Sequence, residues 1–391
     1  MKPPDPGGLV AAGELLMVAV EASADLHGAA VLRALQALRP GLRAFGAGGP
    51  RMRALGFEAL VRAEDLSVMG VAEVLPALPR ILDAMDALRD AVRERRPRAA
   101  LLIDSPDFNL RLARQLRLLG IPVAYFIGPS VWAWRTWRVR QIARDVSRML
   151  VILPFEEQFY ARHGVRATYV GNPLADDLRA LPMPGTGGRE LRAALHLDPA
   201  RPVLALLPGS RLQEIHRLWP PILAAARALR ARQPGLQLVV PVAPTIDRAL
   251  LHAPDVVFLD GRAPELLAAS DAAIVASGTA TLEAALAQTP LVVVYRTSWL
   301  TWLVGRLLVR VRFVSLVNLL AGRALVPELL QTECTPERIA AAAAPLLEES
   351  PARGAQLEGL RALRDLLAPA GAPHAARRVA AEVLQLLDGR P

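Results

Sequence analysis

The sequence predicts an α/β protein made of two doubly wound domains of similar size. Short apolar runs alternate with longer amphipathic stretches rich in Ala, Leu and Arg in both halves of the chain. Such continuous apolar runs are typical of parallel strands that helices cover on both faces. A stretch rich in Pro and Gly, 179–190, separates the halves and is typical of a linker. We therefore expect ligands beyond the strand ends, where the two domains face each other across a cleft.

Each half supplies about five expected strands. In the first half they are 15–20, 42–47, 99–103, 122–127 and 148–153, with a helix at 27–38 after the first. In the second half they are 203–208, 236–242, 256–261, 272–277 and 291–296. The expected domains are 1–178 and 179–354. A helical segment at 355–391 is expected to pack back on the N-terminal domain or on a partner subunit.

Composition excludes several classes of protein. With 53% apolar and 21% charged residues, the 391-residue chain can build full cores and is not disordered. Its lone cysteine, Cys334, allows neither an internal disulfide nor a cysteine-based metal site. We recognise no signal peptide and no apolar run of the ~18–20 residues that a membrane span needs. The net charge of +9 favours anionic partners. Because a lone cysteine gives no disulfide framework, we expect a cytoplasmic protein.

The stretch "LLPGSRLQEI" at 206–215 predicts a phosphate-binding turn between a strand and a helix. Gly209 permits a tight turn, Ser210 can cap the helix, and the helix N-terminus favours an anion. Arg211 adds a guanidinium suited to phosphate. The alternative is an ordinary capped helix with a surface arginine, and the pattern of a Walker A loop is absent.

The stretch "VASGTATLEAAL" at 275–286 repeats this arrangement. Ser277, Gly278 and Thr279 end a strand and begin a helix, and Glu283 follows four residues after Thr279. A carboxylate there can bind a ribose diol, as acidic residues do in nucleotide sites. The alternative is that Glu283 only complements the helix dipole.

Two loops of the first half carry carboxylates. In "LLIDSPDFNL", Asp104 and Asp107 follow a buried strand, and one of them could be a general base, although an Asx-turn or helix N-cap suits Asp107 better. "VEASADLHGA" at 20–29 is a polar loop that holds Glu21, Ser23 and Asp25. The chain has no DxD, no HExxH and no cluster of its six histidines, so we expect neither a metal nor another cofactor.

The stretch "GPSVWAWRTWRVR" at 128–140 gathers three tryptophans and several arginines. Trp132 and Arg135 are the candidates for a site that holds something both apolar and anionic. The alternative is a buried aromatic cluster, with Trp134 simply part of the core.

Taken in order, these stretches resemble the lipid-A-disaccharide synthase family, inverting glycosyltransferases of the GT-B type with two Rossmann-like domains. The resemblance covers roughly residues 15–340. The segments that carry it are "EASADLHGA", "GGPRMRALGFEAL", "LSVMGVAEVLPALPRIL", "DSPDFN", "PSVWAWR", "LPFE", "LLPGSR", "ASGTATLEAAL", "VVVYR" and "NLLAGRALVPELLQ". Two departures matter: Val20 and Ala24 replace the glycines of the family's "GExSGD", and Val317 replaces a proline.

The resemblance implies a reaction and assigns roles. The family condenses UDP-2,3-diacylglucosamine with 2,3-diacylglucosamine 1-phosphate, giving the lipid A disaccharide 1-phosphate and UDP. Asp104 matches the proposed catalytic aspartate, while Arg211, Glu283 and Asn318 match donor-binding residues. The N-terminal domain would then bind the acceptor and the second domain the UDP-sugar.

The resemblance also implies peripheral contact with the anionic inner face of the cytoplasmic membrane. The expected membrane-contact residues recur at helical spacing: Val71, Val74, Leu75, Leu78, Ile81 and Leu82. The segment 298–313, with Arg306, Arg310 and Arg312, would be a second contact. A homodimer through the C-terminal region is a further expectation.

Three alternatives stay open at this stage. One is a transferase or epimerase of the same fold that uses another UDP-sugar. Another is a paralogue that binds a nucleotide sugar without activity, which the changes at Val20 and Ala24 would favour. A nucleic-acid-binding protein is the third, and no recognition motif supports it.

Overall fold

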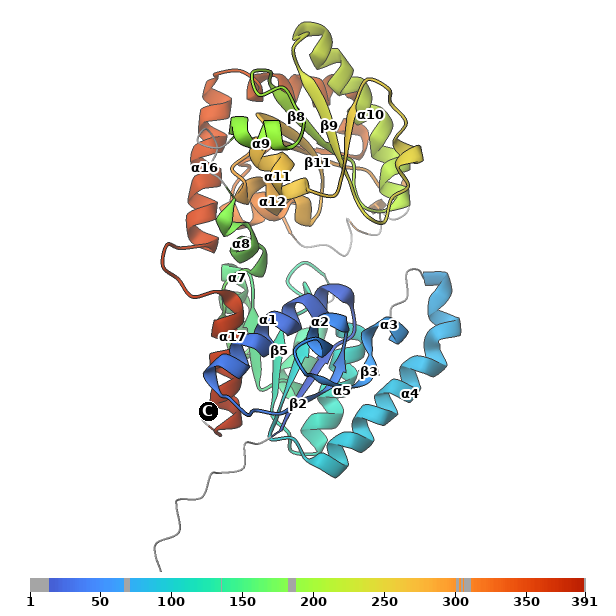
Figure 1. Ribbon diagram of the computed structural model, residues 1–391, viewed down its shortest axis with the longest axis vertical. Helices are drawn as coiled ribbons and strands as arrows, with labels where there is room; N and C mark the ends of the chain where they lie inside the picture. The colour runs from blue at the N-terminus through green and yellow to red at the C-terminus, as the bar shows by residue number, and fades with distance from the viewer. Residues whose placement is uncertain are drawn as a thin grey trace, which may run out of the picture. The chain divides into compact units, whose positions relative to one another are not determined.

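The computed structural model describes residues 14–66, 71–134, 136–181, 188–299, 302, 303, 305 and 311–389, without the side chains of 71–77 and 180. The chain divides into two compact units (Figure 1). Unit 1 comprises Met1–Pro173 and Pro373–Pro391, and unit 2 comprises Leu174–Ala372. Both are α/β, as the sequence predicts.

Unit 1 contains a seven-stranded parallel sheet in the order β3-β2-β1-β4-β5-β6-β7. Its strands are β1 (Leu15–Ala19), β2 (Ala44–Gly48), β3 (Glu58–Arg62), β4 (Ala99–Ile103), β5 (Val123–Phe126), β6 (Arg148–Val151) and β7 (Ala167–Tyr169). Its helices are α1 (Ala22–Leu38), α2 (Pro50–Arg53), α3 (Ala63–Leu66), α4 (Val71–Arg95), α5 (Pro106–Leu118), α6 (Arg138–Asp145), α7 (Pro154–Ala161) and α17 (Ala375–Leu387).

Helices cover both faces of this sheet, and β1 shows why its sequence is apolar at every position. Leu16 and Val18 contribute to a core shared with α4, α5 and α6. Leu15 and Met17 contribute to the opposite core, shared with α1 and α17. Because successive strand side chains point to opposite faces, a strand buried on both sides needs an unbroken apolar run.

Unit 2 contains a six-stranded parallel sheet in the order β10-β9-β8-β11-β12-β13. Its strands are β8 (Val203–Leu207), β9 (Gln237–Val242), β10 (Val257–Asp260), β11 (Ala272–Ala276), β12 (Leu291–Tyr295) and β13 (Glu328–Leu330). Its helices are α9 (Gly188–Ala194), α10 (Leu212–Arg232), α11 (Ala263–Ala269), α12 (Thr279–Leu286), α14 (Leu316–Ala321), α15 (Pro336–Ala343) and α16 (Pro351–Leu367), with the short α8 (Pro173–Asp177) at the boundary. Helices α10 and α15 cover one face, while α11, α12 and α16 cover the other.

The C-terminal segment is shared between the units. Leu360 and Leu363 of α16 pack in unit 2. Helix α17 packs against α1 in unit 1, where Val379 and Val383 are fully buried (Figure 1). The buried Arg148 of β6 also joins α17, because its guanidinium donates to the Glu382 carboxylate at 2.5 Å.

Candidate functional site

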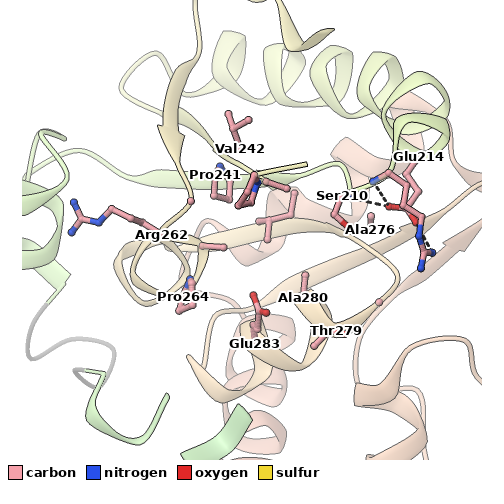
Figure 2. Close-up of a pocket in the computed structure, with 18 of the residues that line it drawn as sticks. Ser210, Glu214, Pro241, Val242, Arg262, Pro264, Ala276, Thr279, Ala280 and Glu283 are labelled. Atoms are coloured by element: carbon pink, nitrogen blue, oxygen red, sulfur yellow. Dashed lines mark hydrogen bonds and ion pairs between the residues drawn. The ribbon is translucent and has the colours of Figure 1, made fainter. Parts of the chain in front are cut away.

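A pocket of about 470 Å³ lies in unit 2, beyond the carboxyl ends of four neighbouring strands (Figure 2). The loops after β8 and β11 contribute 209–211 and 277–280, the two stretches that the sequence singled out. The end of β9 with the loop after it contributes 241–244, and the loop after β10 with the start of α11 contributes 261–264. The sequence analysis missed both. Parallel strands end at one edge of their sheet, so these four loops converge.

The first loop turns at Gly209, whose φ is +119°. A Cβ there would lie 2.4 Å from Oε2 of Glu214, so only glycine fits. The Glu214 carboxylate accepts the backbone N–H groups of Ser210 at 3.0 Å and Arg211 at 3.3 Å, as the dashed lines in Figure 2 show. These N–H groups therefore already bind a carboxylate in the protein alone. The Arg211 side chain is 83% exposed and approaches the same carboxylate at 3.3 Å.

The prediction that Ser210 caps α10 is wrong. The helix begins one residue later than expected, with Arg211 at the N-cap position, and no side chain caps it there. Glu214 supplies the capping from within the first turn, through its bond to the Arg211 N–H.

The second loop ends at Gly278, and α12 begins at Thr279. Glu283 stands on α12 with its carboxylate directed into the pocket (Figure 2). Within the described part of the chain it has no hydrogen-bond or ion-pair partner, and burial alone raises the pKa of its carboxyl. A half-buried carboxylate without a partner is costly unless a ligand satisfies it, which favours a binding role.

Asn318, expected to bind the donor, is buried and uses its whole amide inside the protein. Its oxygen accepts the N–H groups of Leu325 and Val326, and its Nδ2 donates to Val326 O and to Glu328. Glu328 also accepts the N–H groups of Val314 and Ser315. This carboxylate, which the sequence analysis missed, fixes the loop in front of α14.

Asp104 lies at the exit of β4 in unit 1, on a strained backbone. Asp104 and Ser105 both have positive φ, at 53° and 44°. The Asp104 carbonyl accepts the Tyr125 hydroxyl at 2.6 Å and the Asn109 amide at 2.8 Å, which fix this turn. Two consecutive non-glycine residues in this region are uncommon and cluster at functional sites.

The Asp104 carboxyl has a raised pKa. Burial raises its pKa above the ordinary value of 3.8, the N–H of Ser105 partly opposes this, and the negative charge of Glu21 adds to it. Glu21 belongs to the same cluster, because its carboxylate accepts the Ser105 hydroxyl at 2.7 Å. A raised carboxyl pKa is typical of a general base.

Asp107 and Asp25 have other surroundings. Asp107 is exposed in the first turn of α5 and pairs with Arg138. The prediction of a polar loop at 20–29 is wrong beyond Glu21, because α1 already begins at Ala22. Asp25 is buried in this helix and accepts the N–H groups of Gly49, Arg51 and Met52 at the start of α2. Ser23 is exposed.

The tryptophan segment is not a buried cluster. Trp134 and Trp137 are 43% and 64% exposed, which contradicts the alternative that Trp134 is core. Trp132 is anchored, since its indole N–H donates to the buried Glu156 at 3.1 Å and its ring packs edge-on against Phe155. Burial raises the Glu156 pKa to about 7. Arg135 lies outside the described residues.

The structure describes only some of the expected membrane-contact residues. The side chains of Val71, Val74 and Leu75 are not among the described ones, and Arg306 and Arg310 lie outside the described residues. Leu78 and Leu82 are 40% and 51% exposed, and Ile81 packs partly against the core. In the second segment, Arg312 lies over the Phe313 ring.

Two kinds of feature are absent from the described residues. No helix among them is long and apolar enough to span a bilayer. Nor do they contain a group of three His, Cys, Asp or Glu side chains arranged to hold a metal ion.

Solved structures share the fold of this chain at low sequence identity. The UDP-GlcNAc 2-epimerase from Neisseria meningitidis, bound to UDP-GlcNAc, superposes with a TM-score of 0.62 at 12% identity, over 96% of this chain and 100% of that chain. The calicheamicin glycosyltransferase CalG4 superposes with a TM-score of 0.60 at 18% identity, over 96% and 98%. These likenesses establish the GT-B fold alone.

Sequence relatives are much closer. The family model described as lipid-A-disaccharide synthetase matches residues 15–374. Lipid-A-disaccharide synthase of Anaeromyxobacter dehalogenans (strain 2CP-C) is 55% identical over 381 residues, covering 96% of this chain and 97% of the relative. That of Myxococcus xanthus (strain DK1622) is 52% identical over 379 residues, covering 95% and 97%. Since these similarities span both units and their loops, this chain belongs to the lipid-A-disaccharide synthase family of GT-B glycosyltransferases.

Proposed function

We propose that this protein condenses UDP-2,3-diacylglucosamine with 2,3-diacylglucosamine 1-phosphate. The products would be the lipid A disaccharide 1-phosphate and UDP. Family membership along nearly the whole chain carries this proposal. It disfavours an epimerase or another transferase, because the epimerase likeness is one of fold alone.

The pocket of unit 2 is the proposed donor site. The diphosphate would take the place of the Glu214 carboxylate at the N–H groups of Ser210 and Arg211, with the Arg211 guanidinium as a further contact. Ser277, Gly278 and Thr279 would offer a second helix N-terminus. Glu283 would bind the ribose hydroxyls, which gives its buried carboxylate hydrogen-bond donors. Asn318 would act through the shape of its loop.

Asp104 is the proposed general base of an inverting displacement. Its carboxylate would take the proton of the acceptor 6-hydroxyl as that oxygen attacks the anomeric carbon of the donor. The bond from that carbon to the UDP oxygen breaks on the opposite side, and UDP leaves with the electron pair. Arg211 and the two helix N-termini would stabilise the charge on the departing diphosphate.

The Asp104→Asn variant tests the base. We expect a normal fold and a loss of roughly 10²–10⁴-fold in turnover, because the amide cannot take the proton. Mass spectrometry of the disaccharide product measures it, and Asp107→Asn is the matched control with near-normal turnover. In the wild type, turnover should also fall as pH drops through the raised Asp104 pKa, where the base becomes protonated. Near wild-type turnover of Asp104→Asn would transfer the role to another carboxylate.

The Arg211→Ala variant tests the donor site. Hydrogen bonds to charged groups contribute about 1.5–3 kcal/mol each, so UDP affinity should fall roughly tenfold or more. Calorimetric titration with UDP measures this, with Arg217→Ala on the same helix as the control. Equal affinities of wild type and Arg211→Ala would remove Arg211 from the site.

We also propose that unit 1 contacts the anionic inner face of the cytoplasmic membrane through the start of α4. The net charge of +9 and the exposed Leu78 and Leu82 support this. Replacing both leucines by serine should reduce the salt-resistant fraction that sediments with anionic vesicles and leave UDP affinity unchanged. An unchanged fraction would contradict the contact.

A further inference from the structure

Unit 1 contains a second, larger pocket of about 700 Å³ that no role has yet explained. It lies among α4, α5 and the loops after β1 and β4. Its apolar lining comes from Leu66, Leu78, Ile81, Leu82, Met85 and Phe108. Its volume falls within the range of roughly 300–1,000 Å³ that small-molecule sites occupy.

The polar lining of this pocket begins at the turn that carries Asp104, the proposed base. Glu21 and Ser105, which are hydrogen-bonded to each other beside Asp104, both line it. Asp107, Arg111 and Gln115 continue along α5 at intervals of four residues. Residues spaced in this way share one face of a helix, so Arg111 lies about 6 Å along the axis from Asp107.

Arg111 lines the pocket, unlike Arg114 on the same helix, and among the described residues it is unpaired, unlike Arg117 and Arg138. Arg117 pairs with Asp145, and Arg138 pairs with Asp107. Arg111 is exposed and has no ion pair or hydrogen bond within the described part of the chain. A guanidinium beside an apolar wall matches a ligand that combines an anionic group with a hydrocarbon chain.

We propose that this pocket holds an acyl chain of the acceptor and that Arg111 binds the acceptor's phosphate. This inference rests on the proposed function and identifies what unit 1 recognises. The 6-hydroxyl and the 1-phosphate are attached through C5 and C1, the two carbons that flank the ring oxygen, so several bonds separate them. In the proposed arrangement the hydroxyl reaches Asp104 while the phosphate lies one helical turn further along α5. The acyl chain then covers Leu78 and Leu82, which are otherwise partly exposed to water.

Steady-state kinetics in neutral detergent test the role of Arg111. Arg111→Ala should raise KM for the acylated glucosamine 1-phosphate about 10- to 100-fold, with kcat and the donor KM little changed. Arg111→Lys should recover part of this loss, since it keeps the charge. Arg114→Ala, an exposed arginine on the same helix, is the matched control. Against an acceptor that lacks the phosphate, wild type and Arg111→Ala should behave alike. An unchanged KM in Arg111→Ala would overturn the assignment.

A separate experiment tests whether the pocket holds the acyl chain. Leu82→Asp changes a half-exposed residue, so the fold should survive. It should reduce the preference for the acylated over the deacylated acceptor by about tenfold or more, because it puts a charge against the chain. An unchanged preference would show that the pocket does not hold the chain.

Binding without turnover separates this inference from the proposed function. Calorimetry with acylated glucosamine 1-phosphate in neutral detergent should show weaker binding to Arg111→Ala than to wild type, even if the wild type forms no disaccharide. If the wild type forms no disaccharide but still binds the acceptor more tightly than Arg111→Ala does, the proposed function is wrong and this inference stands. If Arg111→Ala loses affinity only for anionic vesicles, Arg111 binds a lipid headgroup and the inference is wrong.

Discussion

Asp104 and Glu283 both lie near the carboxyl ends of the parallel strands of their sheets, and burial raises the pKa of both carboxyls. Their surroundings differ. The backbone of Asp104 is in the left-handed region, which costs of order 1–3 kcal/mol per residue. Two side-chain hydrogen bonds to its carbonyl offset this cost. Glu283 stands in a regular helix without a partner in the described chain. The first arrangement fixes the position of the backbone that carries the Asp104 carboxyl, and the second leaves the oxygens of Glu283 without a partner in the described chain.

Glu156 predicts a pH dependence of stability. Its folded pKa of about 7 lies above the ordinary 4.5, so the folded protein binds more protons between these values than the unfolded chain. The contribution of Glu156 to stability should therefore be fully present below pH 4.5 and should be lost as pH rises through 7, by about 3 kcal/mol. Urea denaturation at several pH values measures this, with Glu156→Gln as the comparison because it cannot ionise. Identical pH profiles for the two proteins would contradict the raised pKa.

Residues whose chemistry conflicts with their local pattern gave the clearest signals in the sequence. A carboxylate after an apolar run singled out Asp104, and a Gly-Ser-Arg turn singled out the loop after β8, which lines the pocket of unit 2. The buried Glu156 and the half-buried Glu328 gave no such signal, because their partners are backbone groups and side chains that only the fold brings near. Asp25 was a candidate because it lies in a polar stretch, and Asn318 because it matches a residue of the family, but backbone N–H groups occupy the side-chain oxygens of both.

At the scale of elements, the strands that the sequence analysis missed are β3, β7 and β13. All three are edge strands of their sheets, and their side chains are mostly half-buried or exposed. An edge strand has one neighbour and less covering, so it does not need the continuous apolar run that reveals a central strand. The central strands, which position the site loops, were all predicted.

Asp25 connects two elements, and its replacement tests that role. Asp25→Asn keeps the size but turns an NH₂ group toward backbone N–H donors, so we expect unit 1 to lose about 3 kcal/mol of stability. Urea denaturation measures it, and Ser23→Ala in the same turn is a control without effect. A stable Asp25→Asn variant with a raised acceptor KM would instead identify Asp25 as a ligand contact.

At the scale of the whole molecule, the chain leaves unit 1 near residue 173 and returns to it near 373. The returning α17 buries Val379, Ala380, Val383 and Leu387 in the core of unit 1 and supplies the partners of Arg148. The sequence predicted a helical C-terminal segment that packs on the N-terminal domain or on a partner subunit. It could not decide between these, because an amphipathic helix does not specify the surface that it covers.

Truncation after Ala372 tests this arrangement. It uncovers an apolar face and leaves Arg148 buried without its carboxylate, so unit 1 should be strongly destabilised while unit 2 keeps its stability. Hydrogen exchange should show protection lost in β1, β4 and β5 but kept in β8 and β11. Truncation after Asp388 is the control with full protection. Equal protection in both truncated proteins would mean that α17 contributes little to unit 1.

The position of α17 also has a consequence for synthesis on the ribosome. The last strand of the first sheet ends at Tyr169, but α17 begins only at Ala375. At roughly 5–20 residues per second, translation of the intervening stretch takes about 10–40 s. During that interval the nascent unit 1 exposes the apolar face that α17 later covers, and Arg148 lacks its partner. Unit 2 is synthesised within the same interval, so the domain begun first is completed last.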